Sequence, residues 1–202
     1  MAGNETLDTY NSSAPQLAEY FRGIGPRIKY IDRALDLAQK NDGSADILEI
    51  GCGDGRDASA IVKKTRSYRG IDYSASMIDI AKHAVPNGEF MVADMSDYQY
   101  PEEAYDVVFA FASVLHLDRI ALGGLMVSVA KALRPNGIFY ISTKYRPTYQ
   151  GEWKEDEFGR RLFYFYNQEE IRGLSSGLFD VVFEEIEQIK GNPWVETALR
   201  KI

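Results

Sequence analysis

Hydrophobic and polar positions along the chain follow two periods. Short apolar runs closed by glycine, proline or polar residues predict strands at residues 45–50, 68–72, 89–93, 105–111 and 138–143. Apolar residues at helical spacing predict helices at residues 16–21, 28–38, 57–64, 76–84 and 117–133. Because strands alternate with helices, the pattern predicts an α/β fold, with a mostly parallel sheet covered by helices on both faces.

The C-terminal part of the chain departs from this alternation. Residues 145–166 are rich in aromatic and charged side chains, and we expect a long connection there, which is uncommon unless it serves a function. Asn167, with Glu170 three positions later, predicts the start of another helix. The alternating segments 179–189 and 193–202 predict a terminal antiparallel hairpin.

Length and composition fit a globular protein. The chain has 202 residues, of which 45% are hydrophobic and 26% are charged. No repeat or linker divides it, so we expect one domain over residues 1–202, with N-terminal helices in 1–44 and an insertion on the substrate side at 145–166. The single cysteine, Cys52, excludes an intramolecular disulfide.

Charge and hydropathy narrow the range of partners. With 30 acidic and 23 basic residues the net charge is −7, which argues against a broad surface for nucleic acid or anionic lipid. The N-terminus lacks the basic and apolar regions of a signal peptide, and no apolar run approaches the roughly 20 residues of a membrane span. We therefore expect a cytoplasmic protein with no membrane or nucleic-acid partner.

A glycine-rich loop, Glu49-Ile-Gly-Cys-Gly-Asp-Gly55, lies between the first predicted strand and the next predicted helix. Glycines allow the backbone to turn tightly and to approach a ligand closely. Arg56 stands where the dinucleotide fingerprint has a glycine, which disfavours a pyrophosphate loop and with it a nicotinamide dehydrogenase. The loop therefore indicates a different nucleotide-like cofactor, and the alternative is an ordinary turn between strand and helix.

Two carboxylates follow the next two predicted strands. Asp72 ends the second strand, where it can accept hydrogen bonds from both hydroxyls of a ribose, although it could instead cap the following helix. Asp94 ends the third strand beside Met95, a pair that suits the amino group and the ring face of an adenine. With Glu49, these carboxylates end consecutive strands at one edge of the sheet, where open α/β folds bind ligands.

These segments, in this order, resemble the class I S-adenosylmethionine (SAM)-dependent methyltransferases over nearly the whole chain. The similarity is carried by residues 47–56, 70–77, 92–95 and 105–116, and extends to 133–139 and 194–201. It implies a three-layer Rossmann-like fold whose seven-stranded sheet has an antiparallel last strand. It also implies that the loop holds the methionine part of SAM, that Asp72 holds its ribose, and that Asp94 holds its adenine. The implied cofactor-binding residues are Glu49, Gly51, Cys52, Gly53, Gly55, Arg56, Asp72, Tyr73, Met77, Asp94, Met95, Ala110 and Phe111.

Candidates for catalysis and for acceptor binding lie outside the cofactor motifs. His116 is a candidate general base, since imidazole titrates near neutral pH, but it could equally pack at the start of a helix. Aromatic side chains can wall a pocket and arginines can hold an anion, although a charge-rich segment is more often a solvated cover. No metal site is expected. The predicted substrate-binding residues are Tyr10, Tyr20, His116, Tyr145, Trp153, Arg160, Arg161, Tyr164 and Tyr166.

The resemblance implies transfer of the SAM methyl group to an oxygen, nitrogen or sulfur atom of a small molecule, including an anionic one. The product would be S-adenosylhomocysteine (SAH), and the protein would act as a monomer or homodimer. The alternatives are a protein methyltransferase and a non-catalytic SAM-binding partner or sensor. A nucleic-acid amino-methyltransferase is disfavoured, because residues 110–113 read Ala-Phe-Ala-Ser instead of an Asn/Asp-Pro-Pro-Tyr-like motif.

Overall fold

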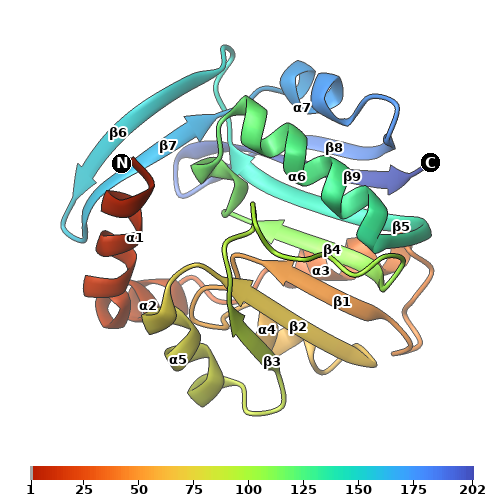
Figure 1. The fold of residues 1–202 in the computed structure, drawn as a ribbon, viewed down its shortest axis with the longest axis horizontal. Helices are drawn as coiled ribbons and strands as arrows, with labels where there is room; N and C mark the ends of the chain where they lie inside the picture. Colours follow the sequence, from red (N-terminus) through yellow and green to blue (C-terminus); the bar gives the residue numbers. More distant parts are fainter. Residues whose placement is uncertain (1) are drawn as a thin grey trace.

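A computed structural model describes residues 2–202 of the chain (Figure 1). The strands are β1 (Asp46–Ile50), β2 (Ser67–Asp72), β3 (Glu89–Val92), β4 (Tyr105–Phe111), β5 (Leu133–Lys144), β6 (Gln150–Asp156), β7 (Gly159–Phe165), β8 (Phe179–Ile189) and β9 (Asn192–Lys201). The helices are α1 (Ala2–Ser12), α2 (Ala14–Arg22), α3 (Ile28–Leu37), α4 (Ala58–Ile61), α5 (Ala75–Ala84), the 3₁₀ turn η1 (Val114–His116), α6 (Arg119–Ala132) and α7 (Gln168–Ser175).

The main sheet has seven strands in the order β3-β2-β1-β4-β5-β9-β8, and β6 and β7 form a separate two-stranded sheet. Strands β1 to β5 run parallel, whereas β9 pairs antiparallel with both β5 and β8. The predicted fold class, with its antiparallel last strand, is confirmed. Because β1, β2, β3 and β4 are parallel, the loops at their carboxyl ends meet at one edge of the sheet.

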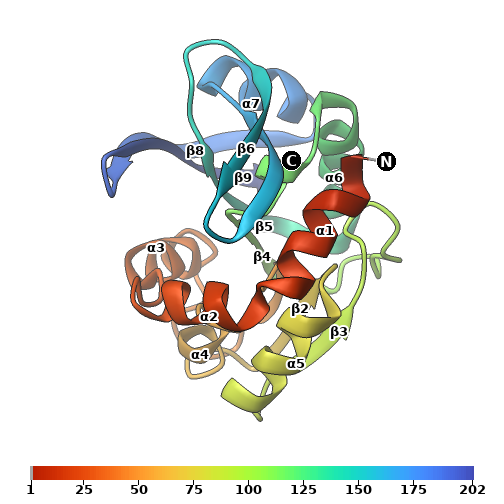
Figure 2. The ribbon, with the colours of Figure 1, turned by 90° about the vertical axis from the view of Figure 1, so that its left-hand side faces the viewer.

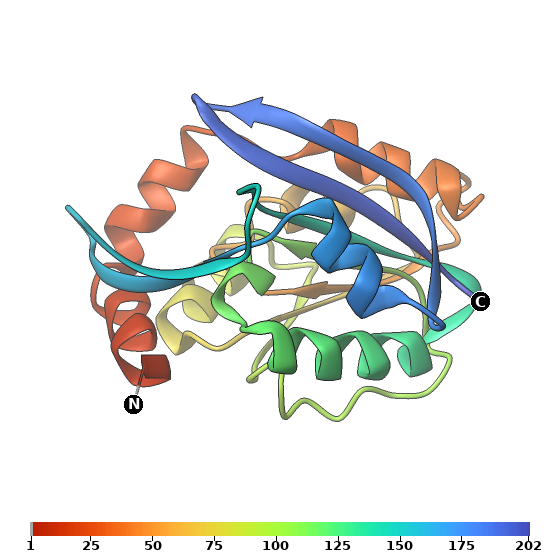
Figure 3. The same cartoon turned by 90° about the horizontal axis from the view of Figure 1, so that it is seen from above.

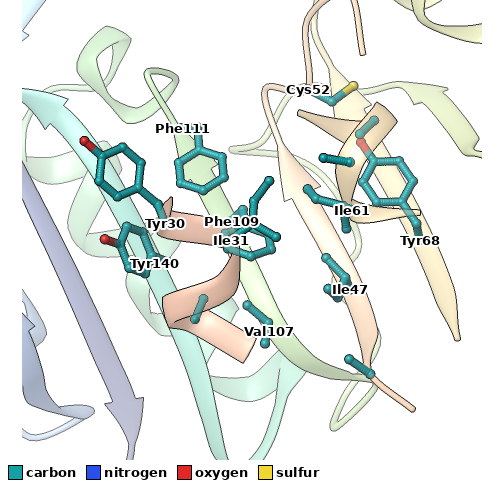
Figure 4. Close-up of a cluster of buried hydrophobic side chains, with 14 of the residues drawn as sticks. Tyr30, Ile31, Ile47, Cys52, Ile61, Tyr68, Val107, Phe109, Phe111 and Tyr140 are labelled. Atoms are coloured by element: carbon teal, nitrogen blue, oxygen red, sulfur yellow. The ribbon is translucent and has the colours of Figure 1, made fainter. Parts of the chain in front are cut away.

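Side chains alternate across the sheet and build a core on each face. Helices cover both faces (Figure 3), and Figure 4 draws one of the two cores. Along β4, Val107, Phe109 and Phe111 belong to the cluster that contains buried residues of α3, α4 and α5. The intervening Val108 and Ala110 belong to the cluster with α6 and α7. Every residue of β4 is buried, as expected of a central strand covered on both faces.

Several elements differ from the prediction. Residues 145–166 contain the β6–β7 hairpin and not an irregular connection, because Arg161, Phe163 and Phe165 alternate inward along β7. Helix α1 lies in the polar start of the chain, where no helix was predicted. The predicted helix at 57–64 is a single turn, α4, and α6 starts at Arg119 after the η1 turn. Strand β5 begins at Leu133, upstream of the predicted start.

Helix α1 lies along β7 and against α5, across the carboxyl edge of the sheet (Figure 2). Hydroxyl side chains at helical spacing bond to alternate backbone positions of the strand. The bonds run from Leu162 N–H to Thr6 Oγ1 at 3.1 Å, from Thr9 Oγ1 to the Arg160 carbonyl at 2.8 Å, and from Ser13 Oγ to the Phe158 carbonyl at 2.6 Å. This hydroxyl ladder holds α1 over the ends of the strands.

Candidate functional site

A pocket of about 360 Å³ opens at the carboxyl edge of the sheet. Its volume falls in the range of small-molecule sites, and its lining is mostly apolar. It is walled by the loops that follow β1, β2, β3 and β4, and it is covered by α1 and β7. The lining residues that come from the strand ends include Glu49, Gly51, Cys52, Gly53, Asp54, Asp72, Tyr73, Asp94, Met95, Phe111 and Ser113.

The glycine loop closes on itself and leaves little room for an anion. Gly51 has φ +71°, and a Cβ there would lie 2.3 Å from the Cβ of Ser113, so this position requires glycine. The N–H groups of Gly51 and Cys52 both donate to the Ile71 carbonyl, and that of Gly53 donates to Asp72. Because the N–H groups of these three residues are occupied, they cannot bind a pyrophosphate, which needs several free backbone N–H donors.

Asp72 is held at the end of β2 by the backbone. Its Oδ2 accepts from Gly53 N–H at 2.9 Å and its Oδ1 accepts from Ser74 N–H at 2.8 Å. Each oxygen retains a second lone pair, so the carboxylate can accept two further hydrogen bonds from neighbouring hydroxyls. Burial raises the pKa of Asp72, and the two backbone bonds oppose that rise.

Asp94 and Met95 line the pocket beside Asp72. One oxygen of Asp94 accepts from Ser96 N–H at 2.8 Å, which fixes the side chain after β3. Its other oxygen can accept from an amino group, and the Met95 side chain supplies apolar surface next to it. The geometry is compatible with the predicted adenine subsite.

Acidic and basic groups meet on the β1 side of the pocket. Asp57 binds both Arg27, at 2.6 Å, and Arg56. Glu49 is buried and accepts from the Tyr68 hydroxyl at 2.6 Å, and burial raises its pKa well above its ordinary value. Burial also raises the pKa of Asp54 to about 6. The carboxyl groups outnumber the guanidinium groups here, and a positively charged ligand would favour their ionised forms.

His116 and Tyr10 form the wall of the pocket nearest to β7. The Nε2 atom of His116 lies 3.0 Å from the Tyr10 hydroxyl, and its Nδ1 lies 2.7 Å from the carbonyl oxygen of Leu162. Burial lowers the pKa of His116 to about 4, and the nearby charges of Arg161 and Lys144 act in the same direction. A ring in these surroundings is neutral near pH 7 and a weak base, which favours a positioning role over the predicted general base.

Most of the predicted cofactor-binding residues lie together in the lining of this pocket. The exceptions are Gly55 and Ala110. A Cβ on Gly55 would contact Ala81 of α5, and Ala110 is buried in the core on the face of α6. Cys52 lies in the lining, but its N–H bonds to Ile71, and burial raises the pKa of its thiol well above the ordinary value. A backbone N–H contact from Cys52 to a cofactor is therefore not available.

Of the predicted substrate-binding residues, the structure places Tyr10, His116 and Tyr164 in the pocket lining. Tyr166 is buried and donates to the Leu117 carbonyl, and Tyr145 bridges to it in the backbone. The others lie outside the lining and are held by their neighbours. Arg160 pairs with Glu5 and lies over Trp153, Arg161 pairs with Asp156, and Tyr20 packs on Phe21 and Phe158.

Several lining residues escaped the sequence analysis. Arg27 comes from the segment before α3, and Leu162 comes from β7. Asp57 follows the motif 47–56 and Ser113 lies within the motif 105–116, but nothing in their spacing distinguishes them from ordinary polar residues. A period-of-two pattern in 159–165 could have revealed β7 and with it Leu162.

Comparison with known proteins agrees with this architecture. Residues 47–137 match the family model of a methyltransferase domain. The match covers less than half of the chain, and it agrees with the resemblance to the class I S-adenosylmethionine-dependent methyltransferases. The matched segment runs from β1 past β4 to the start of β5, so it contains the glycine loop, Asp72 and Asp94.

Individual methyltransferases match parts of this chain. A fatty-acid O-methyltransferase of Mycolicibacterium smegmatis is 31% identical over 113 residues, which are 54% of this chain and 40% of that protein. A trans-aconitate 2-methyltransferase of Enterobacter sp. is 33% identical over 103 residues, 50% of this chain and 39% of that protein. The matched segments therefore span less than half the length of these curated relatives.

Among solved structures, the 1,6-didemethyltoxoflavin-N1-methyltransferase of Burkholderia thailandensis, solved with bound 1,6-didemethyltoxoflavin and SAH, superposes on this chain with a TM-score of 0.72. The match covers 100% of this chain and 91% of that one at 19% identity, so it shows the shared fold. Within residues 2–202, no helix has the length and apolar character needed to cross a membrane.

Proposed function

We propose that this protein is a SAM-dependent methyltransferase that acts on a small molecule. The observation that carries the proposal is Asp72, which ends β2 with both oxygens fixed by the glycine-loop and α5 backbones and with lone pairs left for two ribose hydroxyls. A loop whose glycine and cysteine N–H groups are occupied, beside an excess of carboxyl groups, supports a cationic cofactor over a pyrophosphate.

The pocket residues fit this cofactor. Asp72 would hold the ribose, Asp94 and Met95 would hold the adenine, and Glu49 with Asp54 would face the positively charged methionine part. SAM supplies a methyl group on a sulfonium whose charge disappears on transfer. The protein then needs mainly to hold an acceptor in line with that methyl group and to keep water away. Tyr10 and Leu162, in the cover formed by α1 and β7, suit that task.

The first test is binding. We expect SAM and SAH to bind by calorimetry with dissociation constants well below millimolar, and Asp72→Ala to weaken both by at least about tenfold, because charge-assisted hydrogen bonds are lost. Asp79→Ala, on the exposed side of α5, is the matched control and should bind normally. Failure of the wild-type protein to bind either compound would refute the proposal.

The second test is turnover. Isotopically labelled SAM with a panel of metabolites should yield labelled small molecules, and Asp72→Ala should lose this activity at low SAM concentration. Binding without transfer to any member of the panel would instead favour a SAM sensor or a non-catalytic partner. Transfer to protein in a cell extract, but to no small molecule, would favour a protein methyltransferase.

A further inference from the structure

The hydrogen bonds of His116 fix the position of its ring hydrogen. A carbonyl oxygen only accepts, so the Nδ1 atom, 2.7 Å from the Leu162 carbonyl, carries the hydrogen. In a neutral ring the Nε2 atom must then accept, and the group that donates to it is the Tyr10 hydroxyl at 3.0 Å. The low pKa of His116 agrees with a neutral ring, because burial disfavours the imidazolium.

This arrangement decides what Tyr10 can offer inside the pocket. Its hydrogen is directed at His116, so the hydroxyl oxygen can only accept from a bound molecule. Asp118 lines the same part of the pocket, and its carboxylate also accepts, one oxygen already taking the Ala121 N–H at 2.9 Å. The hydroxyls of Ser113 and Tyr164, which also line the pocket, can donate or accept. The groups whose role is fixed, Tyr10 and Asp118, are therefore both hydrogen-bond acceptors.

The arginines of the lining are paired with a carboxylate, and two further positive charges lie near the His116–Tyr10 pair but outside the lining. Arg27 and Arg56, the arginines in the lining, both bind Asp57. Arg161 lies close to the Tyr10 ring and pairs with Asp156 through one nitrogen, while its Nε has no partner among the described residues. Lys144 lies over the Phe163 ring, and neither side chain belongs to the lining. Within residues 5–202, the lining contains no lysine, and both of its arginines already pair with a carboxylate. An anionic acceptor would therefore find no free positive side chain in the lining.

Taking the proposed methyl transfer as its basis, we infer that the acceptor is a neutral amine whose N–H donates to Tyr10 Oη. The nitrogen lone pair forms a bond to the methyl carbon while the carbon–sulfur bond breaks, and that electron pair goes to sulfur. The product leaves the pocket as a methylated ammonium ion. It then loses its extra proton to water. The step requires no base, and His116 is a positioning residue that orients the Tyr10 hydroxyl.

The tautomer can be tested on the protein alone. The chain has two histidines, so His83→Gln, on the exposed side of α5, leaves His116 as the sole imidazole. We expect ¹⁵N NMR to show a protonated Nδ1 and an unprotonated Nε2 from pH 5.5 to 8. In Tyr10→Phe the Nε2 signal should shift, because its donor is gone. A ring that titrates near pH 6.5, or that carries its hydrogen on Nε2, would overturn the inference.

The acceptor class can be tested with a matched pair of probes, 4-propylaniline and 4-propylbenzoate, which share one skeleton and differ in the polar group. With labelled SAM we expect kcat/KM for the aniline to exceed that for the benzoate by at least about tenfold. The aniline should also bind the SAH-loaded protein more tightly. If the benzoate binds or reacts as well as the aniline, or better, the inference is wrong.

Variants connect this preference to Tyr10. Tyr10→Phe should lower kcat/KM for the aniline by about tenfold, as expected for a lost hydrogen bond, while the dissociation constant of SAM changes less than twofold. Tyr98→Phe, which removes a tyrosine hydroxyl outside the pocket, should leave both unchanged. If Tyr10→Phe weakens SAM binding and leaves the aniline preference intact, Tyr10 serves the cofactor and the inference is wrong. If the wild-type protein does not bind SAM, the proposed function itself is refuted.

Discussion

Asp54 connects the charge of a ligand to the protonation state of the pocket. Burial and the nearby carboxylates Asp57 and Asp72 raise its pKa to about 6, so near that pH about half of the molecules carry a proton there. A positively charged ligand in the pocket would favour the ionised form and lower this pKa. Binding of a cation and loss of a proton are therefore linked.

We predict that SAM binding releases up to about half a proton at pH 6, and that its affinity increases as the pH rises from 5 to 7. Calorimetry at pH 6 in two buffers with different ionisation enthalpies measures the released protons. Asp54→Asn should remove most of the release, whereas Asp97→Asn, in the exposed loop after β3, should keep it. Proton uptake on binding would contradict the prediction.

Residue types and spacing predicted the part of the site that follows the strand ends. Asp72 and Asp94 could be placed because parallel strands bring their carboxyl ends to one edge, and a short loop leaves a side chain little freedom. Arg27 reaches the pocket through its pairing with Asp57, a contact between distant segments that no local pattern encodes. The same holds for Leu162, whose carbonyl fixes the ring of His116.

At the scale of elements, α1 is a helix held mainly by polar contacts. Its sequence carries few apolar residues, so no helical apolar period marked it, and its position follows from the hydroxyl ladder to β7. The β6–β7 hairpin was obscured for a related reason, because charged side chains such as Arg161 occupy buried positions that usually hold apolar ones. Both elements have side chains whose partners are distant in sequence.

We predict that the variant Thr6→Val, Thr9→Val, Ser13→Ala loosens α1 from β7, since each lost hydrogen bond contributes about 1 kcal/mol. Amide hydrogen exchange at Leu162, whose N–H bonds to Thr6, should become roughly tenfold faster. SAM affinity should fall several-fold, because α1 lines the pocket. Ser12→Ala, whose hydroxyl bonds only within the helix, is the matched control. Unchanged exchange at Leu162 would show that other contacts hold α1.

At the scale of the whole molecule, the order and direction of the strands followed from the alternation of short apolar runs with helical segments. The sheet also buries a carboxyl group that no pattern revealed. Glu196 of β9 is fully buried and accepts from the Ser142 hydroxyl at 2.6 Å, while its Oε2 has no hydrogen-bond partner among the described residues. Burial raises the pKa of Glu196 from its ordinary 4.5 to about 8.

The folded chain therefore holds a proton on Glu196 between pH 4.5 and 8 that the unfolded chain lacks. The free energy of unfolding must fall as the pH rises through this window, by up to about 1.4 kcal/mol per pH unit from this group. Glu196→Gln keeps the neutral shape, so its stability should decline less and exceed that of the wild type by roughly a few kcal/mol at pH 8. Urea unfolding between pH 5 and 9 measures both slopes, with Glu155→Gln, exposed on β6, as a control that keeps the wild-type slope. Parallel curves for wild type and Glu196→Gln would show that Glu196 is ionised in the folded protein.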